Sequence, residues 1–285
     1  MRGLACVLVL VVSGLMLPSA PAAPITRPGG DITPPARREV PGQRFDLTCG
    51  KLFVPDYIAP AEQVNVVIWF HGAAWCVEQE MSLARTPAVL LTWDANKRKP
   101  QFADEASIEA VLTEVVGTLC EHGILTGAKG GVRRVGVGSF SGGYGAVLDL
   151  LRLERFSRQV SDVVLADSLY PPRGKTNFVD LDEPLAPVLA YARRAAAGEC
   201  RLVFSQLYPP DPQYRGNGTT IAANWLIDRT GATRTKCDDT LDGRRRLYHA
   251  DRAGLHVIGL AGMANQDHFD HLYQCHVLLR EMTFE

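Results

Sequence analysis

The stretch VGVGSFSGGYGAVLDLLRL, residues 135–153, places a serine between an apolar run and a leucine-rich stripe. The apolar run is typical of a buried strand, and the stripe is typical of one face of a helix. A sharp strand-to-helix turn strains its central residue, and the residues two before and two after it must be small because their Cβ atoms would otherwise collide. Ser141 has Ser139 and Gly143 at these two positions. Centring the turn on Ser139 would crowd Val137, so the spacing predicts a nucleophile elbow with Ser141 at its centre.

Apolar runs and helical patterns alternate along most of the chain. Runs typical of buried strands occur at residues 64–70, 88–93, 133–140, 162–167, 201–206 and 255–262, after one or two early strands at 44–55. Helical patterns occur at residues 104–122, from about 142, and at 182–197, 219–228 and 271–282. This alternation predicts a mostly parallel sheet with helices on both faces, joined by right-handed crossovers. We expect a single domain over residues 44–285.

The segment before this domain has two parts of different composition. Residues 1–22 begin with Arg2, continue with an apolar run too short to span a bilayer comfortably, and end with small residues suited to cleavage. This order predicts a signal peptide and a secreted or periplasmic protein. Residues 23–43 are rich in Pro, Gly and Arg and predict an extended linker or a strap over the domain surface. No later stretch reaches membrane-spanning length, so we expect no stable membrane insertion.

Export also affects the interpretation of the cysteines. An even number of cysteines in an oxidising compartment predicts that most of them form disulfides, although sequence does not choose the pairing. The cysteines that follow the signal peptide are Cys49, Cys76, Cys120, Cys200, Cys237 and Cys275. The formal net charge of −1 gives no broad electrostatic case for a nucleic-acid partner.

A turn rich in small residues follows the apolar run at residues 64–70. Its sequence, HGAAW, leaves backbone N–H groups unpaired at the carboxyl end of a strand, where ligands bind in sheets of this kind. A second N–H should come from the residue just after Ser141. Two converging N–H donors would hold the oxyanion of a tetrahedral intermediate. The residues predicted to bind the oxyanion or the substrate are His71, Gly72, Ala73, Trp75 and Gly142.

Two carboxylates and two histidines compete for the remaining positions. Asp167 directly follows the strand at 162–166 and could orient a histidine. Asp211 follows the next strand, between two prolines, and remains the alternative. We place His268 in the loop after the last strand, from which it can reach the strand ends. We place His271 in the closing helix, where it should support the loop or cap the helix.

A metal site built from the same segment is a rival hypothesis. Asp267, His268, Asp270 and His271 carry ligand side chains. Nothing upstream offers obvious further ligands, so we expect no metal and no cofactor.

Together these residues resemble the α/β-hydrolase family over nearly all of the predicted domain. The resemblance rests on the elbow SFSGG at residues 139–143, the His71-Gly72 turn and a late histidine. It implies Ser141 as nucleophile, His268 as general base and Asp167 as orienting acid, in the chain order expected for this architecture. Ser139 departs from the family's first elbow glycine but is sterically tolerated. The family more often places its acid one strand later, which keeps Asp211 as an alternative.

This resemblance implies an exported serine hydrolase that cleaves a carboxylic ester through an acyl-enzyme intermediate. The substrate would be a small-molecule or polymer-attached acyl ester. Three alternatives stay open: an amidase or peptidase with the same triad, a non-catalytic binding member of the fold, and a metal-dependent hydrolase.

Overall fold

The computed structural model describes residues 31–93, 104–127, 130–172, 174–175, 177–209 and 218–284. The signal peptide predicted at residues 1–22 and the alternative acid Asp211 lie outside the described residues.

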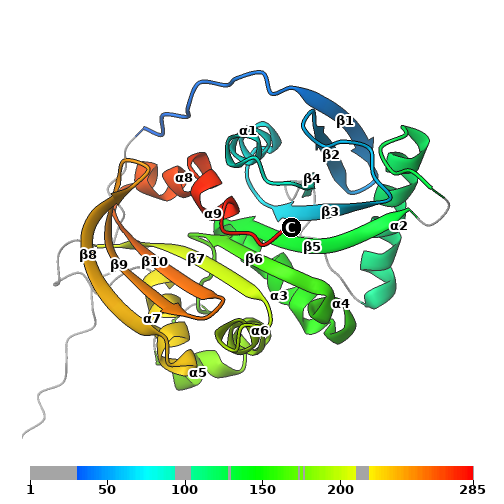
Figure 1. Ribbon diagram of the computed structural model, residues 1–285. Coiled ribbons are helices and arrows are strands. Elements are labelled where there is room, and N and C mark those ends of the chain that lie inside the picture. The colour runs from blue at the N-terminus through cyan, green and yellow to red at the C-terminus, as the bar shows by residue number, and fades with distance from the viewer. Residues whose placement is uncertain are drawn as a thin grey trace, which may run out of the picture.

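A single mixed sheet forms the centre of the molecule, and its strand order is β1-β2-β4-β3-β5-β6-β7-β10-β9-β8 (Figure 1). The strands are β1 (Gly42–Leu47), β2 (Gly50–Pro55), β3 (Gln63–Phe70), β4 (Val89–Trp93), β5 (Gly131–Phe140), β6 (Val160–Ala166), β7 (Arg201–Tyr208), β8 (Thr233–Leu241), β9 (Arg244–Arg252) and β10 (Leu255–Ala261). Neighbouring strands from β4 through β10 in this order are parallel, and the strands at both ends of the sheet are antiparallel. The predicted mostly parallel sheet is confirmed.

Helices cover both faces of this sheet. They are α1 (Ala74–Ala84), α2 (Glu105–Glu121), α3 (Tyr144–Arg152), α4 (Glu154–Gln159), α5 (Val179–Asp182), α6 (Ala186–Ala196), α7 (Gly218–Thr230), α8 (Asn265–Tyr273) and α9 (His276–Leu279). Among the described residues, no helix is long and apolar enough to cross a membrane.

Strand β3 shows why its predicted run is continuously apolar. Side chains of a strand point alternately to opposite faces of the sheet. Val66, Ile68 and Phe70 lie in the core cluster that includes residues of α2, α3, α6 and α7. Val67 and Trp69 lie in the cluster on the other face, with residues of α1, α8 and α9. Because both faces are covered, no polar alternation marks the strand.

The hairpin formed by β8 and β9 is absent from the predicted elements. Its outer strand, β8, has the sequence TRTKCDDTL, and its residues are exposed or only partly buried. An edge strand of this kind carries charged side chains, which discourage pairing with another chain. It therefore lacks the apolar run that marks the inner strands.

Residues 31–41 lie extended against α1 and α8 (Figure 1). The Thr33 N–H donates to Gln266 Oε1 at 2.6 Å, and the Arg38 N–H donates to Gln79 Oε1 at 2.9 Å. Val40 is buried in the cluster beneath α1. These contacts hold this segment along the surface of the domain.

The prediction that most cysteines form disulfides is wrong for this structure. The six cysteines of the described residues are all free. They are spread over separate elements, and the buried ones pack as small apolar side chains. Burial, with the charge of Glu114, raises the pKa of Cys49 to about 11, and burial, with the charge of Glu80, raises the pKa of Cys76 to about 12. An even cysteine count therefore does not establish pairing.

Candidate active site

Ser141 lies at the turn from β5 into a short 3-10 segment, Ser141–Gly143, that leads into α3. Its φ is 49°, in the left-handed region that costs a side-chain-bearing residue of order 1–3 kcal/mol. Two residues later, a Cβ on Gly143 would lie only 2.4 Å from the Phe70 carbonyl oxygen. The sequence thus uses a glycine where the turn passes against β3, and the turn holds the Ser141 side chain clear of the sheet.

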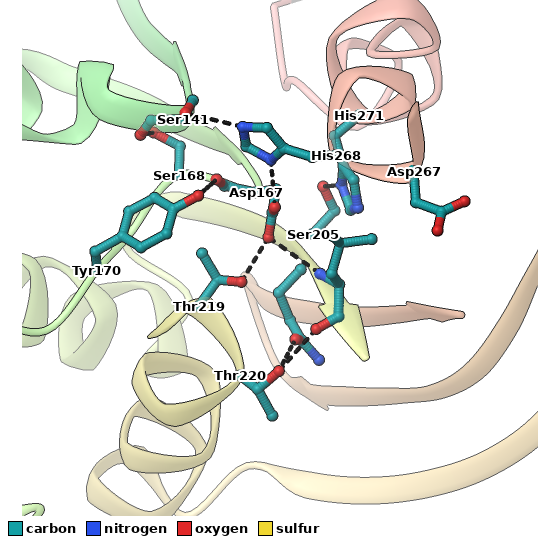
Figure 2. Close-up of polar contacts among 12 residues, drawn as sticks. Ser141, Asp167, Ser168, Tyr170, Ser205, Thr219, Thr220, Asp267, His268 and His271 are labelled. Atoms are coloured by element: carbon teal, nitrogen blue, oxygen red, sulfur yellow. Dashed lines mark hydrogen bonds and ion pairs between the residues drawn. The ribbon is translucent and has the colours of Figure 1, made fainter. Parts of the chain in front are cut away.

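The Ser141 hydroxyl lies in line with a buried histidine and a buried aspartate (Figure 2). His268 Nε2 is 2.9 Å from Ser141 Oγ, and His268 Nδ1 is 2.6 Å from Asp167 Oδ2. The structure therefore brings these three predicted residues into one continuous hydrogen-bonded chain.

Asp167 directly follows β6 and is completely buried, with a φ of 41°. Its Oδ1 accepts hydrogen bonds from the Leu207 N–H at 3.1 Å and from Thr219 Oγ1 at 2.5 Å. Burial raises the pKa of Asp167, but the hydrogen bond from His268, the electrostatic attraction to His271 and His268 and the Thr219 bond outweigh it and lower the pKa to about 2. A carboxylate here keeps the proton of His268 on Nδ1, so the Nε2 lone pair faces the serine hydroxyl.

A second turn lies beside the elbow, between β3 and α1. Its backbone is also unusual, with a φ of 68° at His71 and of 106° at Gly72. A Cβ on Gly143 would lie 3.0 Å from the His71 Cβ, so the two turns are in close contact. The first N–H groups of a helix lack intrahelical partners, which applies to Gly142 in the 3-10 turn and to the start of α1 after Ala73.

The strand order, the elbow at the end of β5 and the chain order serine, aspartate, histidine at the carboxyl ends of parallel strands now stand together. The chain has the α/β-hydrolase fold. The β8–β9 hairpin extends this fold's sheet beyond its last parallel strand.

Comparison with solved structures gave remote likenesses. No family model matches the chain, and no curated protein matches it. Among solved structures, it is similar to EstE1, a thermophilic and thermostable carboxylesterase from a metagenomic library, at 12% identity over 87% of this chain and 92% of that chain, with a TM-score of 0.48. An arylesterase has 11% identity over 88% of this chain and 87% of that chain, with a TM-score of 0.42. A monoglyceride lipase from Saccharomyces cerevisiae has 9% identity over 87% of this chain and 97% of that chain, with a TM-score of 0.41.

His268 lies in the first half of α8, not in a loop, and that part of the prediction is wrong. The Asp267 carboxylate accepts hydrogen bonds at 2.7 Å from the N–H groups of Met263 and Ala264. These bonds stabilise a helix that begins at Asn265, earlier than the pattern at 271–282 indicates. The closing helix is also interrupted between α8 and α9. The first turns of α8 still aim His268 at the strand ends.

His271, one turn farther along α8, lies outside the hydrogen-bonded chain. Its Nδ1 is 2.7 Å from Ser205 Oγ, beneath the helix. Asp270 accepts a hydrogen bond from Gln266. The four side chains of the rival metal hypothesis thus have separate partners. No group of three His, Cys, Asp or Glu side chains in the described part of the chain could hold a metal ion.

Phe140 is a site residue that the sequence reasoning missed. Its ring stacks on the His268 imidazole at a centroid distance of 4.6 Å and on the His71 ring at 6.0 Å. It therefore links the two turns and holds the His268 ring from one side. Partial burial, with the nearby charge of His268, lowers the pKa of His71. Its place next to Ser141 in the elbow is the only sequence signal for this role.

Trp75 lies in the first turn of α1 and is partly exposed, with the Arg37 guanidinium 6.0 Å from its ring. A groove of about 990 Å³ begins nearby at Gly72–Ala74 and continues past Trp93 to Val111 on α2. Its size is within the usual range for small-molecule sites. The role of Trp75 in substrate binding stays a prediction.

Proposed function

We propose that this chain is a serine hydrolase that cleaves carboxylic esters through an acyl-enzyme intermediate. The observation that carries the proposal is the continuous chain from Ser141 Oγ through the His268 imidazole to the Asp167 carboxylate, with distances of 2.9 Å and 2.6 Å. This arrangement supports the roles of Ser141 as nucleophile, His268 as base and Asp167 as orienting acid, already in contact before a substrate binds.

The reaction follows from the roles of these three groups. A serine hydroxyl is hardly ionised at neutral pH, so it needs a base to attack a carbonyl carbon. His268 Nε2 takes the proton as Ser141 Oγ attacks the ester, and then gives it to the departing alcohol oxygen. Water repeats these steps on the acyl-serine and releases the acid. Asp167 remains a carboxylate throughout and stabilises the imidazolium.

The oxyanion of each tetrahedral intermediate needs donors that are already in place. We assign this role to the N–H of Gly142 and to an N–H of the turn at His71, Gly72 and Ala73, which lies against the elbow. Each such donor is worth roughly 3–4 kcal/mol of transition-state stabilisation.

The finer assignments are also part of this proposal. The substrate is an acyl ester, small or attached to a polymer, bound next to the Gly72–Ala74 end of the groove. Residues 1–22 direct export, so the reaction takes place outside the cytoplasm.

A fluorophosphonate probe and a substrate panel test the proposal together. The probe should label Ser141 in the native protein and fail to label a folded Ser141→Ala variant. The panel should contain acyl esters of graded chain length, acetylated sugars and matched anilides. Ser141→Ala should lose on the order of 10⁴-fold or more in kcat on the best ester.

Ser161→Ala is the matched control, because Ser161 bonds the Val135 carbonyl and Asp162, away from the site. It should keep both labelling and turnover. Near-full activity of Ser141→Ala would overturn the proposal. Turnover of anilides but not of esters would replace ester hydrolysis by amide hydrolysis.

A further inference from the structure

Two serines that the triad does not use lie directly beneath the nucleophile. Ser139 in the elbow and Ser168, next to the acid, both have no exposed surface. Their hydroxyl oxygens are 2.7 Å apart. Ser168 Oγ also donates to the carbonyl oxygen of Ser141 at 2.8 Å.

The direction of this small network follows from proton counting. A serine hydroxyl has one proton to donate. The proton of Ser168 is used on the Ser141 carbonyl oxygen, which can only accept. Ser139 must therefore be the donor to Ser168, and the chain runs from Ser139 through Ser168 to the carbonyl of Ser141.

The carbonyl at the end of this chain belongs to the same peptide group as the Gly142 N–H. The atoms of a peptide group lie in one plane, so holding its oxygen also sets the direction of its N–H. A hydrogen bond to the oxygen also polarises the amide and strengthens its N–H as a donor. This N–H is the one assigned above to the oxyanion.

This peptide group belongs to the 3-10 segment Ser141–Gly143, whose backbone leads directly into α3. Ser141 has a φ of 49°, and a Cβ on the exposed Gly142 would meet no atom within 4 Å. Side-chain packing on Gly142 therefore does not fix the orientation of the peptide. The bond from Ser168 reaches it from the buried side.

We propose that Ser139 and Ser168 are positioning residues that orient and polarise the Gly142 N–H toward the oxyanion. This inference rests on the proposed function. It also gives a reason for a serine at position 139, where the family elbow has a glycine. The Ser139 hydroxyl donates a hydrogen bond to Ser168 Oγ, and the Ser168 hydroxyl donates its own proton to the Ser141 carbonyl oxygen.

Kinetics on the best ester, with a trifluoromethyl ketone analogue of the tetrahedral intermediate, test the proposal. Ser168→Ala should lower kcat about tenfold with KM unchanged, since an oriented donor is weakened but not removed. The inhibition constant of the analogue should rise by the same factor. In a plot of kcat/KM against pH, the fall in rate on the acid side should stay at the same pH, because the contacts of His268 are unchanged.

The order of the chain gives a second test. Ser139→Gly should lower kcat a few-fold by itself and have no further effect in the Ser168→Ala background, because it acts only through Ser168. Ser168→Thr keeps the hydroxyl and should restore the rate. Thr230→Ala is the control, since it removes a buried hydroxyl that donates to the Leu226 carbonyl far from the elbow.

Unchanged kcat and analogue affinity in Ser168→Ala, with ester hydrolysis intact, would overturn this inference and leave the proposed function standing. Losses that add in the double variant, or a shift in the pH of that fall in rate, would indicate a loosened elbow and also overturn it. If Ser168→Ala does not fold, Ser139→Gly and Ser168→Thr decide the question by the same readouts. A protein that neither hydrolyses esters nor takes the probe at Ser141 refutes the proposed function, and this inference with it.

Discussion

The molecule holds two buried imidazoles that each meet a carboxylate at 2.6 Å. His268 meets Asp167 through Nδ1, and its other nitrogen meets a serine hydroxyl. His276 meets Glu80 through Nδ1, and its other nitrogen is 3.2 Å from Asp242. The two clusters are alike on one side of the ring and differ on the other.

The third partner decides what each imidazole can do. Between a carboxylate and a hydroxyl, the ring keeps a lone pair that can accept the hydroxyl proton. Between two carboxylates, the ring meets no hydroxyl that could act as a nucleophile. His276 then ties α1, the start of α9 and the β8–β9 turn together. A histidine–carboxylate pair is therefore no signature of catalysis until its other neighbour is known.

Replacing each histidine separates the two clusters most strongly. The folded fraction of His268→Ala should lose on the order of 10⁴-fold or more in kcat and no longer react with the fluorophosphonate probe. His276→Ala should keep the turnover of its folded fraction but lose about 1–3 kcal/mol of stability, because Glu80, which is 2% exposed, loses its imidazole partner and keeps the N–H of residue 276. Ester kinetics and urea unfolding of both variants measure these effects.

His271→Ala is the control one turn from His268. It should lose mainly stability, since its Nδ1 contacts Ser205 and not the nucleophile. A well-folded but inactive His271→Ala with an active His268→Ala would move the base by one helical turn. An inactive, stable His276→Ala would erase the contrast between the clusters.

The two carboxylates provide a smaller contrast. Asp167→Asn should lower kcat by about 10³–10⁴-fold, because an amide no longer holds the required tautomer of His268. Glu80→Gln should leave kcat of the folded enzyme within a few-fold of the wild type. Stopped-assay initial rates on the same ester compare them, and equal losses in both variants would contradict the assignment.

The sequence predicted the parts of the fold and the site that have a local signal. The apolar runs predicted β3 to β7 and β10, and the small residues around Ser141 predicted the elbow. The β8–β9 hairpin was missed because its edge strand is charged rather than apolar. The start of α8 was missed because it depends on the Asp267 side chain capping its own turn.

Tertiary contacts have no such signal. Thr219 supports Asp167 from α7, and 52 positions separate them in the chain. Ser168 supports the carbonyl of Ser141 from the next strand end. The two histidine clusters look alike in sequence, since nothing local tells which histidine will meet a hydroxyl. Only folding brings these partners together.

The pH dependence of stability should also report on Asp167, the carboxylate that meets His268. The pKa of Asp167 is lowered to about 2 in the folded state, below its ordinary value of 3.8. A depressed pKa stabilises the folded state above the unfolded pKa, and this contribution is lost as pH falls from about 4 toward 2. The contribution is on the order of 2 kcal/mol.

Urea unfolding of the wild type and of Asp167→Asn at pH 6, 4 and 3 measures this contribution. The difference between the two proteins should be largest at pH 6 and should shrink as the pH falls. A difference that stays constant over this range would show that Asp167 is not held as a stabilised carboxylate.

The smallest effect concerns the thiols beside the second cluster. Cys76 and Cys275 are completely buried, and burial together with the charge of Glu80 raises the pKa of both. Cys120 is exposed on α2. Since the thiolate is the reactive form, iodoacetamide at pH 8 should alkylate Cys120 in the native protein well before Cys76 or Cys275, as read by peptide mass spectrometry.

Under denaturing, non-reducing conditions all six thiols of the chain from residue 23 should react. Glu80→Gln should speed the alkylation of Cys76 by less than about tenfold, the size of a one-unit pKa change, whereas Asp167→Asn should not alter it. Thiols that stay unreactive in denaturant would mean that the protein forms disulfides after all.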